Sequence, residues 1–424
     1  MKQILSAAIA AAVLAGTGSA QGAVSEAEWE QFKTQFADMA ARLEALETEN
    51  ARLRQAGVSV PVDDLSQLQA DVVKLQEQNS ASSWTDKLSL AGDFRYRYEY
   101  IDVEDADSRE RNRVRARLAA TARLPNDVEV GMGVATGGDD PVSTNQTLGG
   151  GGSSKELRLD KAYAKWNLTD GFYLQAGKFS NPLYRPQKSG LLWDGDWRPE
   201  GVSAGWQSEH LFVNAIGNWL ESDTRGGNDE FAWGFQGGAR LALGEARLTA
   251  SLAYYDFPTA GATPFFGDKD DPDFFGNSST DDGLRYLYNY EMVELGGDLA
   301  MNMFGMPLSL YGNYVQNQDA DDYDTGWLAG VKLGKTSGKG TWSIGYQYQD
   351  LEADAVLGLL SDSDFAGGGT DGKGHLVALG YGVNKQWSLG LRMFLRNEAG
   401  EKNLADQGGP LDYDRIQIDT KFKY

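Results

Sequence analysis

Apolar and polar residues alternate along two neighbouring stretches of the chain, residues 88–100 and 109–124. In the first stretch, leucine, phenylalanine and tyrosine occupy even positions, while Asp93, Arg95, Arg97 and Glu99 occupy odd ones. In the second stretch, apolar residues hold the even positions from Val114 onward, and arginine recurs at odd positions. Because successive side chains of a strand point to opposite faces, the pattern predicts a β-hairpin with an apolar face and an arginine face.

Two environments suit such a two-faced hairpin. A soluble sandwich would bury the apolar face and leave the arginines in bulk water. A membrane barrel would place the apolar face in lipid and the arginines in a water-filled lumen.

The period of two continues to residue 424 and is divided into about sixteen segments. Short turns and long loops alternate between these segments, as they do in outer-membrane barrels with short periplasmic turns and longer outer loops. Closing the sheet removes every strand edge, which lipid requires. We therefore predict an all-β fold over residues 84–424, a transmembrane antiparallel β-barrel of about sixteen strands.

A different period governs residues 25–80, where apolar residues recur alternately three and four positions apart. The seam comprises Trp29, Phe32, Phe36, Met39, Leu43, Leu46, Asn50 and Leu53. Gly57 and Pro61 interrupt it, and a second seam follows in a shifted register. This spacing predicts a short α-helical coiled coil in the periplasm. The alternative is an amphipathic helix that packs on its own domain.

Residues 1–20 have the features of a secretory signal peptide. Lys2 supplies the positive charge, residues 4–15 form a short apolar run, and Gly18, Ser19 and Ala20 offer a small-residue cleavage site. The apolar run is too short for a membrane anchor. The mature chain is therefore expected in or beyond a bacterial periplasm.

Composition excludes several functional classes. The 424 residues carry a net charge of −22, no cysteine and two histidines. An acidic chain is a poor partner for nucleic acid, and the lack of cysteine excludes disulfides and thiolate metal sites. His210 and His375 stand in no catalytic motif. We predict no enzyme activity, no metal site and no cofactor.

Several stretches make the chain resemble Gram-negative outer-membrane porins of the "putative porin" family. They are residues 94–98, 113–118, 177–178 and 191–201. The terminal residues Phe422 and Tyr424 resemble the barrel-assembly signal of such proteins. Phosphate-selective porins, which also carry N-terminal coiled coils and basic lumens, are the nearest alternative family.

The resemblance implies an outer-membrane protein that contacts lipid and lipopolysaccharide. It also implies a homo-oligomer, with a trimer favoured, although Asn50 at a coiled-coil a position favours dimers in simple coiled coils. No nucleic-acid partner is expected.

The third long connection, residues 179–200, is the candidate constriction, because the third loop of porins of known structure folds into the lumen. Its charged residues are Arg185, Lys188, Asp194, Asp196, Arg198 and Glu200. The candidate basic wall that faces it consists of Arg95, Arg97, Arg111, Arg113, Arg115, Arg117 and Arg158. Opposite charges on loop and wall would create a transverse field. In the alternative reading, these arginines merely line a solvated lumen and pair with Asp93, Glu99 and Asp160.

The sequence predicts a porin for passive diffusion of small hydrophilic solutes or ions. The alternative is a structural outer-membrane protein with a plugged barrel, tethered to peptidoglycan through residues 25–80.

Overall fold

The computed structural model describes residues 87–223, 230–268 and 272–424, together with Ala41, Ala45, Thr48 and Arg52. The chain divides into residues 1–83 and 84–424, and the four isolated positions of the first unit are helical. The predicted signal peptide and coiled coil otherwise lie outside the described residues and stay predictions. Among the described residues, no helix is long and apolar enough to cross a membrane.

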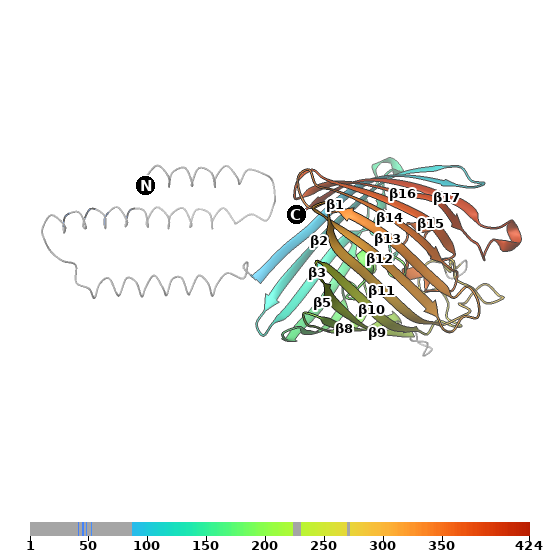
Figure 1. The fold of residues 1–424 in the computed structure, drawn as a ribbon, viewed down its shortest axis with the longest axis horizontal. Coiled ribbons are helices and arrows are strands. Elements are labelled where there is room, and N and C mark those ends of the chain that lie inside the picture. Colours follow the sequence, from blue (N-terminus) through green and yellow to red (C-terminus); the bar gives the residue numbers. More distant parts are fainter. Residues whose placement is uncertain are drawn as a thin grey trace. The chain divides into compact units, whose positions relative to one another are not determined.

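Sixteen long strands of the second unit form one closed antiparallel barrel (Figure 1). They are β1 (Leu88–Val103), β2 (Arg109–Leu124), β3 (Val128–Thr136), β5 (Leu157–Thr169), β6 (Phe172–Lys178), β7 (Glu200–Gln207), β8 (Leu211–Glu221), β9 (Glu230–Leu243), β10 (Ala246–Phe257), β11 (Tyr290–Met303), β12 (Met306–Asn317), β13 (Thr325–Gly334), β14 (Trp342–Leu351), β15 (Gly372–Gly382), β16 (Trp387–Ala399) and β17 (Leu411–Lys423). Each pairs with the next along the chain, and β17 pairs with β1. The two-residue strand β4 (Gln146–Thr147) pairs with β2 outside this ring. The predicted barrel is confirmed.

Most connections alternate in length, as the sequence predicts, although residues 104–108 form a shorter connection than residues 335–341. One rim, the turn end, carries residues 125–127, 170–171, 208–210, 244–245, 304–305, 335–341 and 383–386. The other rim, the loop end, carries eight connections, whose described residues are 104–108, 137–156, 179–199, 222–223, 258–268 with 272–289, 318–324, 352–371 and 400–410. Numbered along the chain, these are loops 1 to 8. Residues 179–199 are therefore loop 3, as the strand count predicts.

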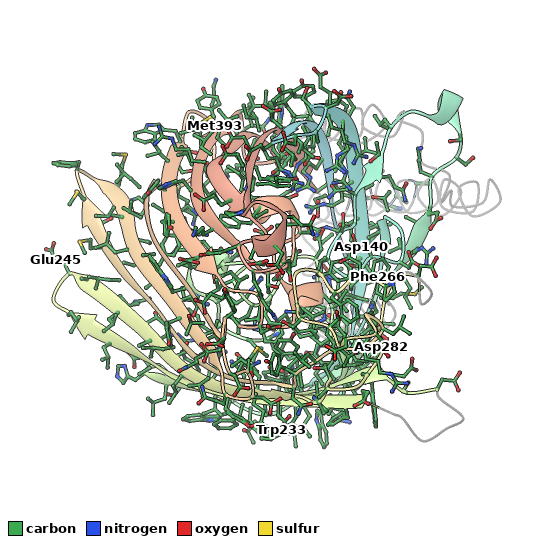
Figure 2. All side chains as sticks on the ribbon, turned by 90° about the vertical axis from the view of Figure 1, so that its right-hand side faces the viewer. Asp140, Trp233, Glu245, Phe266, Asp282 and Met393 are labelled. Carbon is green, nitrogen blue, oxygen red and sulfur yellow. The ribbon has the colours of Figure 1, made fainter. Side chains whose placement is uncertain are left out.

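Exposure of the strand residues is the reverse of that in a soluble protein. The Leu90 side chain on the outer face is 63% exposed, whereas Arg97 and Glu99 on the inner face are 2% and 0% exposed. Trp233 also projects from the outside of the ring (Figure 2). An apolar belt of this extent needs a lipid environment. The hairpin of β1 and β2 thus turns its apolar face outward and its arginine face into the lumen.

A bulge in β5 changes which residues point inward. The pairing of β3 with β5 shifts between Gly133 and Val134, so that Asp160 is the extra residue. Before the bulge Leu157 and Leu159 lie exposed on the outside. After it the outward positions become even-numbered, which turns Lys161 toward the lumen. This is the place where the sequence loses its regular alternation.

Loops 3, 5 and 7 fold into the ring, and Figure 2 shows loop segments inside the circle of strands. Their apolar residues form one buried cluster with inward side chains of β8 to β14. Loop 3 contains the short 3-10 helix η3 (Pro186–Lys188), and loop 7 contains η4 (Gly358–Leu360) and η5 (Phe365–Gly367). One side of the lumen is therefore packed, and the arginine side is polar.

Barrel closure depends on the last residues of the chain. The Tyr424 amide donates to the Gly92 carbonyl at 3.1 Å, and the Gly92 amide donates to the Tyr424 carbonyl at 2.9 Å. The Phe422 ring stacks on Trp387, with centroids 5.4 Å apart. A Cβ on Gly92 would lie 2.5 Å from the Arg117 carbonyl oxygen and 2.6 Å from the Tyr424 ring. Glycine at this position leaves room for the terminal tyrosine.

Replacing Gly92 by alanine should therefore weaken closure. Overpacking of this kind costs about 1–3 kcal/mol, so we expect Gly92→Ala to unfold at a lower temperature in detergent. Gel mobility of heated and unheated samples measures the folded fraction. Gly237→Ala in β9 is the matched control, because nothing lies within 4 Å of its added Cβ. Equal unfolding temperatures for the two variants would contradict a role of Gly92 in closure.

Candidate functional site

Two tryptophans of loop 3, Trp193 and Trp197, pack against the inner face of the barrel. The Trp193 and Trp197 rings stack with centroids 4.7 Å apart, and Trp193 meets the Tyr255 ring of β10 edge-on at 5.1 Å. All three side chains are buried. Aromatic rings supply large buried area and a defined geometry. This anchor holds the acidic part of loop 3 in place against the wall.

Asp196 of loop 3 contacts the arginine face of β2 directly. Its carboxylate lies 3.0 Å from Nη1 of Arg117 and 3.4 Å from Nη1 of Arg115. The same two arginines also bind Asp93 of β1, at 2.7 Å and 2.8 Å. Thr144 of loop 2 donates its hydroxyl to Asp196 at 2.7 Å. Loop 3 is thus joined to the wall by a charge-assisted network.

A second carboxylate reaches the wall from loop 7, and no sequence pattern pointed to it. Asp364 lies 3.0 Å from Arg97, 3.1 Å from Arg392 and 3.0 Å from Arg415. Arg97 additionally makes a bidentate pair with Asp419 of β17, at 2.7 Å and 3.0 Å. The first strand of the barrel, β1, and its last two strands, β16 and β17, therefore converge on one loop carboxylate.

The remaining wall arginines divide into two kinds. Arg111 donates to Glu99 at 2.6 Å. Arg95 donates to the Asn145 side chain and Arg113 to Ser143, both in loop 2, and within the described ranges neither arginine has a carboxylate partner. The sequence left open that the wall arginines pair with Asp93 and Glu99. The structure shows such pairs for Arg111, Arg115 and Arg117.

Other predicted site residues lie apart from this network. Arg158 is 48% exposed near the loop end and pairs with Glu156. Glu200 begins β7 and pairs with Lys178, and Lys188 is exposed in η3. Within loop 3, Arg198 lies 3.2 Å from Asp160, and Arg185 donates to the Trp193 carbonyl at 2.6 Å.

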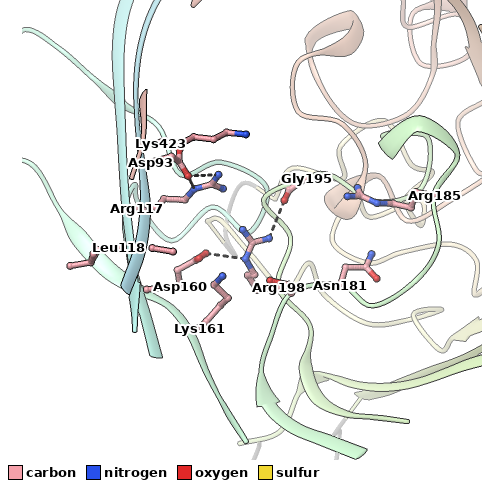
Figure 3. A pocket seen from close by; sticks show the side chains of 14 residues that line it. Asp93, Arg117, Leu118, Asp160, Lys161, Asn181, Arg185, Gly195, Arg198 and Lys423 are labelled. Atoms are coloured by element: carbon pink, nitrogen blue, oxygen red, sulfur yellow. Dashed lines mark hydrogen bonds and ion pairs between the residues drawn. The ribbon is translucent and has the colours of Figure 1, made fainter. Parts of the chain in front are cut away.

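Three cavities follow one another through the polar side of the lumen. The loop-end cavity measures about 570 Å³, the middle cavity about 380 Å³ and the turn-end cavity about 760 Å³. Asp160 and Arg198 line both of the first two, and Ser180 lines both of the last two. Figure 3 shows the middle cavity between the strands that carry Arg117 and Lys161 and the segment of loop 3 that carries Arg185 and Arg198.

The loop carboxylates differ in protonation. Burial and the neighbouring Asp362 and Asp196 raise the pKa of Asp194 to about 8. Burial also disfavours the charged form of Asp196, but Arg115 and Arg117 hold its pKa below the ordinary value. Asp364 is opposed by burial in the same way, and Arg97, Arg415 and Arg392 hold its pKa well below the ordinary value. Asp196 and Asp364 are therefore permanent anions, while Asp194 titrates near neutral pH.

A family model described as "Putative porin" matches residues 101–264 and 285–424. The fold is similar to that of OprB from Pseudomonas putida at high pH, with a TM-score of 0.56 and 14% identity over 81% of this chain and 96% of that chain. Salmonella typhi OmpF in complex with daunomycin has a TM-score of 0.49 and 12% identity over 80% of this chain and 99% of that chain. Comparison with curated proteins finds no match.

The family match and the barrel agree on location and class. The lipid-facing apolar belt and the closed strand ring place the protein in the bacterial outer membrane, where porin-like barrels reside. They support an outer-membrane channel rather than an enzyme. The family model covers more than half of the chain, and the protein belongs to the family described as "Putative porin".

Proposed function

We propose that the chain forms a water-filled channel for passive diffusion of small hydrophilic solutes, with a preference for anions. The observation that carries this proposal is the series of three cavities with shared lining residues. The turn-end cavity is lined by turn residues such as Asp170 and Gly171, and the loop-end cavity by loop residues such as Asp139 and Phe266. Together they mark a polar route from one rim of the barrel to the other.

Loop 3 narrows this route on the side of β1, β2 and β5. The middle cavity is the smallest of the three, and loop 3 forms its inner side. The charged residues that line the middle cavity are five cations and two carboxylates. The cations are Arg117, Lys161, Arg185, Arg198 and Lys423, and the carboxylates are Asp93 and Asp160. An excess of fixed positive charge at a narrow point of the lumen attracts anions and repels cations. Anion preference follows from this charge excess.

Assembly and envelope contacts complete the proposal. The apolar outer face fits contact with lipid and lipopolysaccharide, and we propose a homotrimer exported by the signal peptide of residues 1–20. The Phe422 ring contacts Phe94 of β1 across the closing strand pair, with centroids 6.3 Å apart, which fits a role of the terminal residues in barrel assembly.

The second candidate is a plugged barrel that tethers the envelope. The buried apolar cluster of loops 3, 5 and 7 favours it, because this cluster fills one side of the lumen.

The tether predicts co-sedimentation of the protein with peptidoglycan. We expect deletion of residues 25–80 to abolish co-sedimentation while the barrel still folds, as judged by gel mobility. A plugged barrel would in addition show no conductance in planar bilayers. Conductance of correctly folded protein would exclude the plug.

Arg117→Gln should lower the anion preference of the channel. A unit charge about 7 Å from a permeating ion stabilises an anion and destabilises a cation by about 0.6 kcal/mol each in water. Removing it should therefore lower the anion-to-cation permeability ratio roughly sevenfold. Reversal potentials under a potassium chloride gradient measure this ratio. Arg123→Gln, on the same strand near the turn end, is the charge-matched control and should leave the ratio nearly unchanged. An equal effect of both variants would refute the assignment of Arg117 to the narrow point.

Ion selectivity should also change with pH through Asp194. Because the pKa of Asp194 is raised to about 8, its carboxyl is mostly neutral at pH 6 and becomes charged as pH rises through 8. The added negative charge should lower the anion preference between pH 7 and 9, with a midpoint near 8. Asp194→Asn removes the titrating group and should abolish this step in reversal potential. A step of equal size in the variant would assign the change to another group.

A further inference from the structure

The middle cavity contains more cations than carboxylates, and the carboxylates that line it do not neutralise all of the cations. Its two carboxylates are both engaged: Asp93 binds Arg115 and Arg117, and Asp160 lies 3.2 Å from Arg198. Lys161, Arg185 and Lys423 line the same cavity, and in the described part of the chain none of them has a carboxylate within ion-pair distance. Cations held in a partly enclosed space without counter-charges are costly. The cavity therefore favours an anion from solution.

An unused hydrogen-bond donor lies at the same place. The Asn181 Oδ1 atom accepts a hydrogen bond from the Leu183 amide at 2.9 Å, which fixes the orientation of the side-chain amide. The Asn181 Nδ2 atom is buried and has no partner among the described residues. A buried amide donor without an acceptor is destabilising. Since Asn181 lines the middle cavity, an acceptor bound there would satisfy it.

The positive groups and the neutral Asn181 amide lie on two sides of the cavity. Arg117, Lys161 and Lys423 come from the strand wall, whereas Asn181, Arg185 and Arg198 come from the loop 3 segment (Figure 3). A single compact anion would face only one side at a time. A solute with an oxyanion group at each end could contact both. The volume of about 380 Å³ lies within the range of small-molecule sites.

We propose that the middle cavity is a binding site for small organic dianions that carry an oxyanion group at each end, with dicarboxylates as the preferred class. Lys161 binds one carboxylate from the wall side, and Arg185 with the Asn181 amide binds the other from the loop side. The inference rests on the proposed channel only in that the solute reaches the cavity through the lumen. Binding itself does not require conduction.

Isothermal titration calorimetry on the folded full-length chain in detergent micelles tests binding independently of conductance. Succinate is the probe, butyrate the single-carboxylate control, and inorganic phosphate the compact dianion. We expect succinate to bind at least about tenfold more tightly than either, because a second hydrogen bond to a charged group adds a factor of that order. In bilayers, millimolar succinate should also reduce the chloride current of the open channel.

Three variants separate a local site from the general field of the lumen. Lys161→Gln should weaken succinate binding about tenfold. Asn181→Asp keeps the acceptor for the Leu183 amide but replaces the free donor with a carboxylate that repels an anion, and it should abolish binding. Lys332→Gln is the charge-matched control: Lys332 lies on β13, four residues from the buried inward residue Leu328, and does not line this cavity. It should leave succinate affinity unchanged.

Distinct results overturn the two proposals. Normal chloride conductance without succinate binding would refute the dianion site and leave the channel standing. Succinate binding without conductance would refute the channel and leave the site standing. Equal losses in Lys161→Gln and Lys332→Gln would show a diffuse field instead of a site. Tighter binding of inorganic phosphate than of succinate would refute the two-ended arrangement.

Discussion

Hydrocarbon offers no hydrogen bonds to a backbone, and the structure is organised around that constraint. Each strand satisfies its amides and carbonyls on its neighbours, and the pairing of β17 with β1 removes the last free edge. A closed ring of strands has an outer and an inner face, and successive side chains of each strand point to these faces in turn. The sequence therefore alternates with a period of two. Apolar residues such as Leu90 meet lipid, and the intervening residues, Arg97 among them, must occupy the lumen.

Charges gathered in a lumen create the second constraint. Arginines of β1, β2, β16 and β17 face one another there, and their mutual repulsion requires carboxylates close by. Inward carboxylates of the strands, Asp93 and Asp419, supply some of them, while loops 3 and 7 bring Asp196 and Asp364. Such buried pairs contribute little net stability, but breaking one leaves an unpaired charge. Their main effect is therefore to fix where the two loops lie.

Structural features that follow from the repeating pattern of apolar and polar residues could be predicted from the sequence. Features that leave no such pattern could not. The strands, the alternation of loop lengths and the position of loop 3 follow from local patterning, and so does the inward arginine face. Loop 7 has no such signal, because Asp364 stands in a stretch rich in glycine, serine and aspartate that resembles any exposed loop. The contact of Asp364 with Arg97 spans 267 residues and depends on the closed barrel. The bulge at Asp160 was visible as a loss of alternation, but its effect on Lys161 required the observed register.

The most conspicuous run of arginines is therefore a poor guide to the charge that a solute meets. Arg97, Arg111 and Arg115 bind carboxylates, and Arg95 and Arg113 donate to side chains of loop 2. In the middle cavity, the cations that the described residues leave without a carboxylate are Lys161, Arg185 and Lys423, which stand singly in the sequence. One of them faces the lumen only because a single extra residue reverses the phase of β5. The wall arginines other than Arg117 position the loops, while Arg117 and the scattered cations at the narrow point are the ones that can act on a solute.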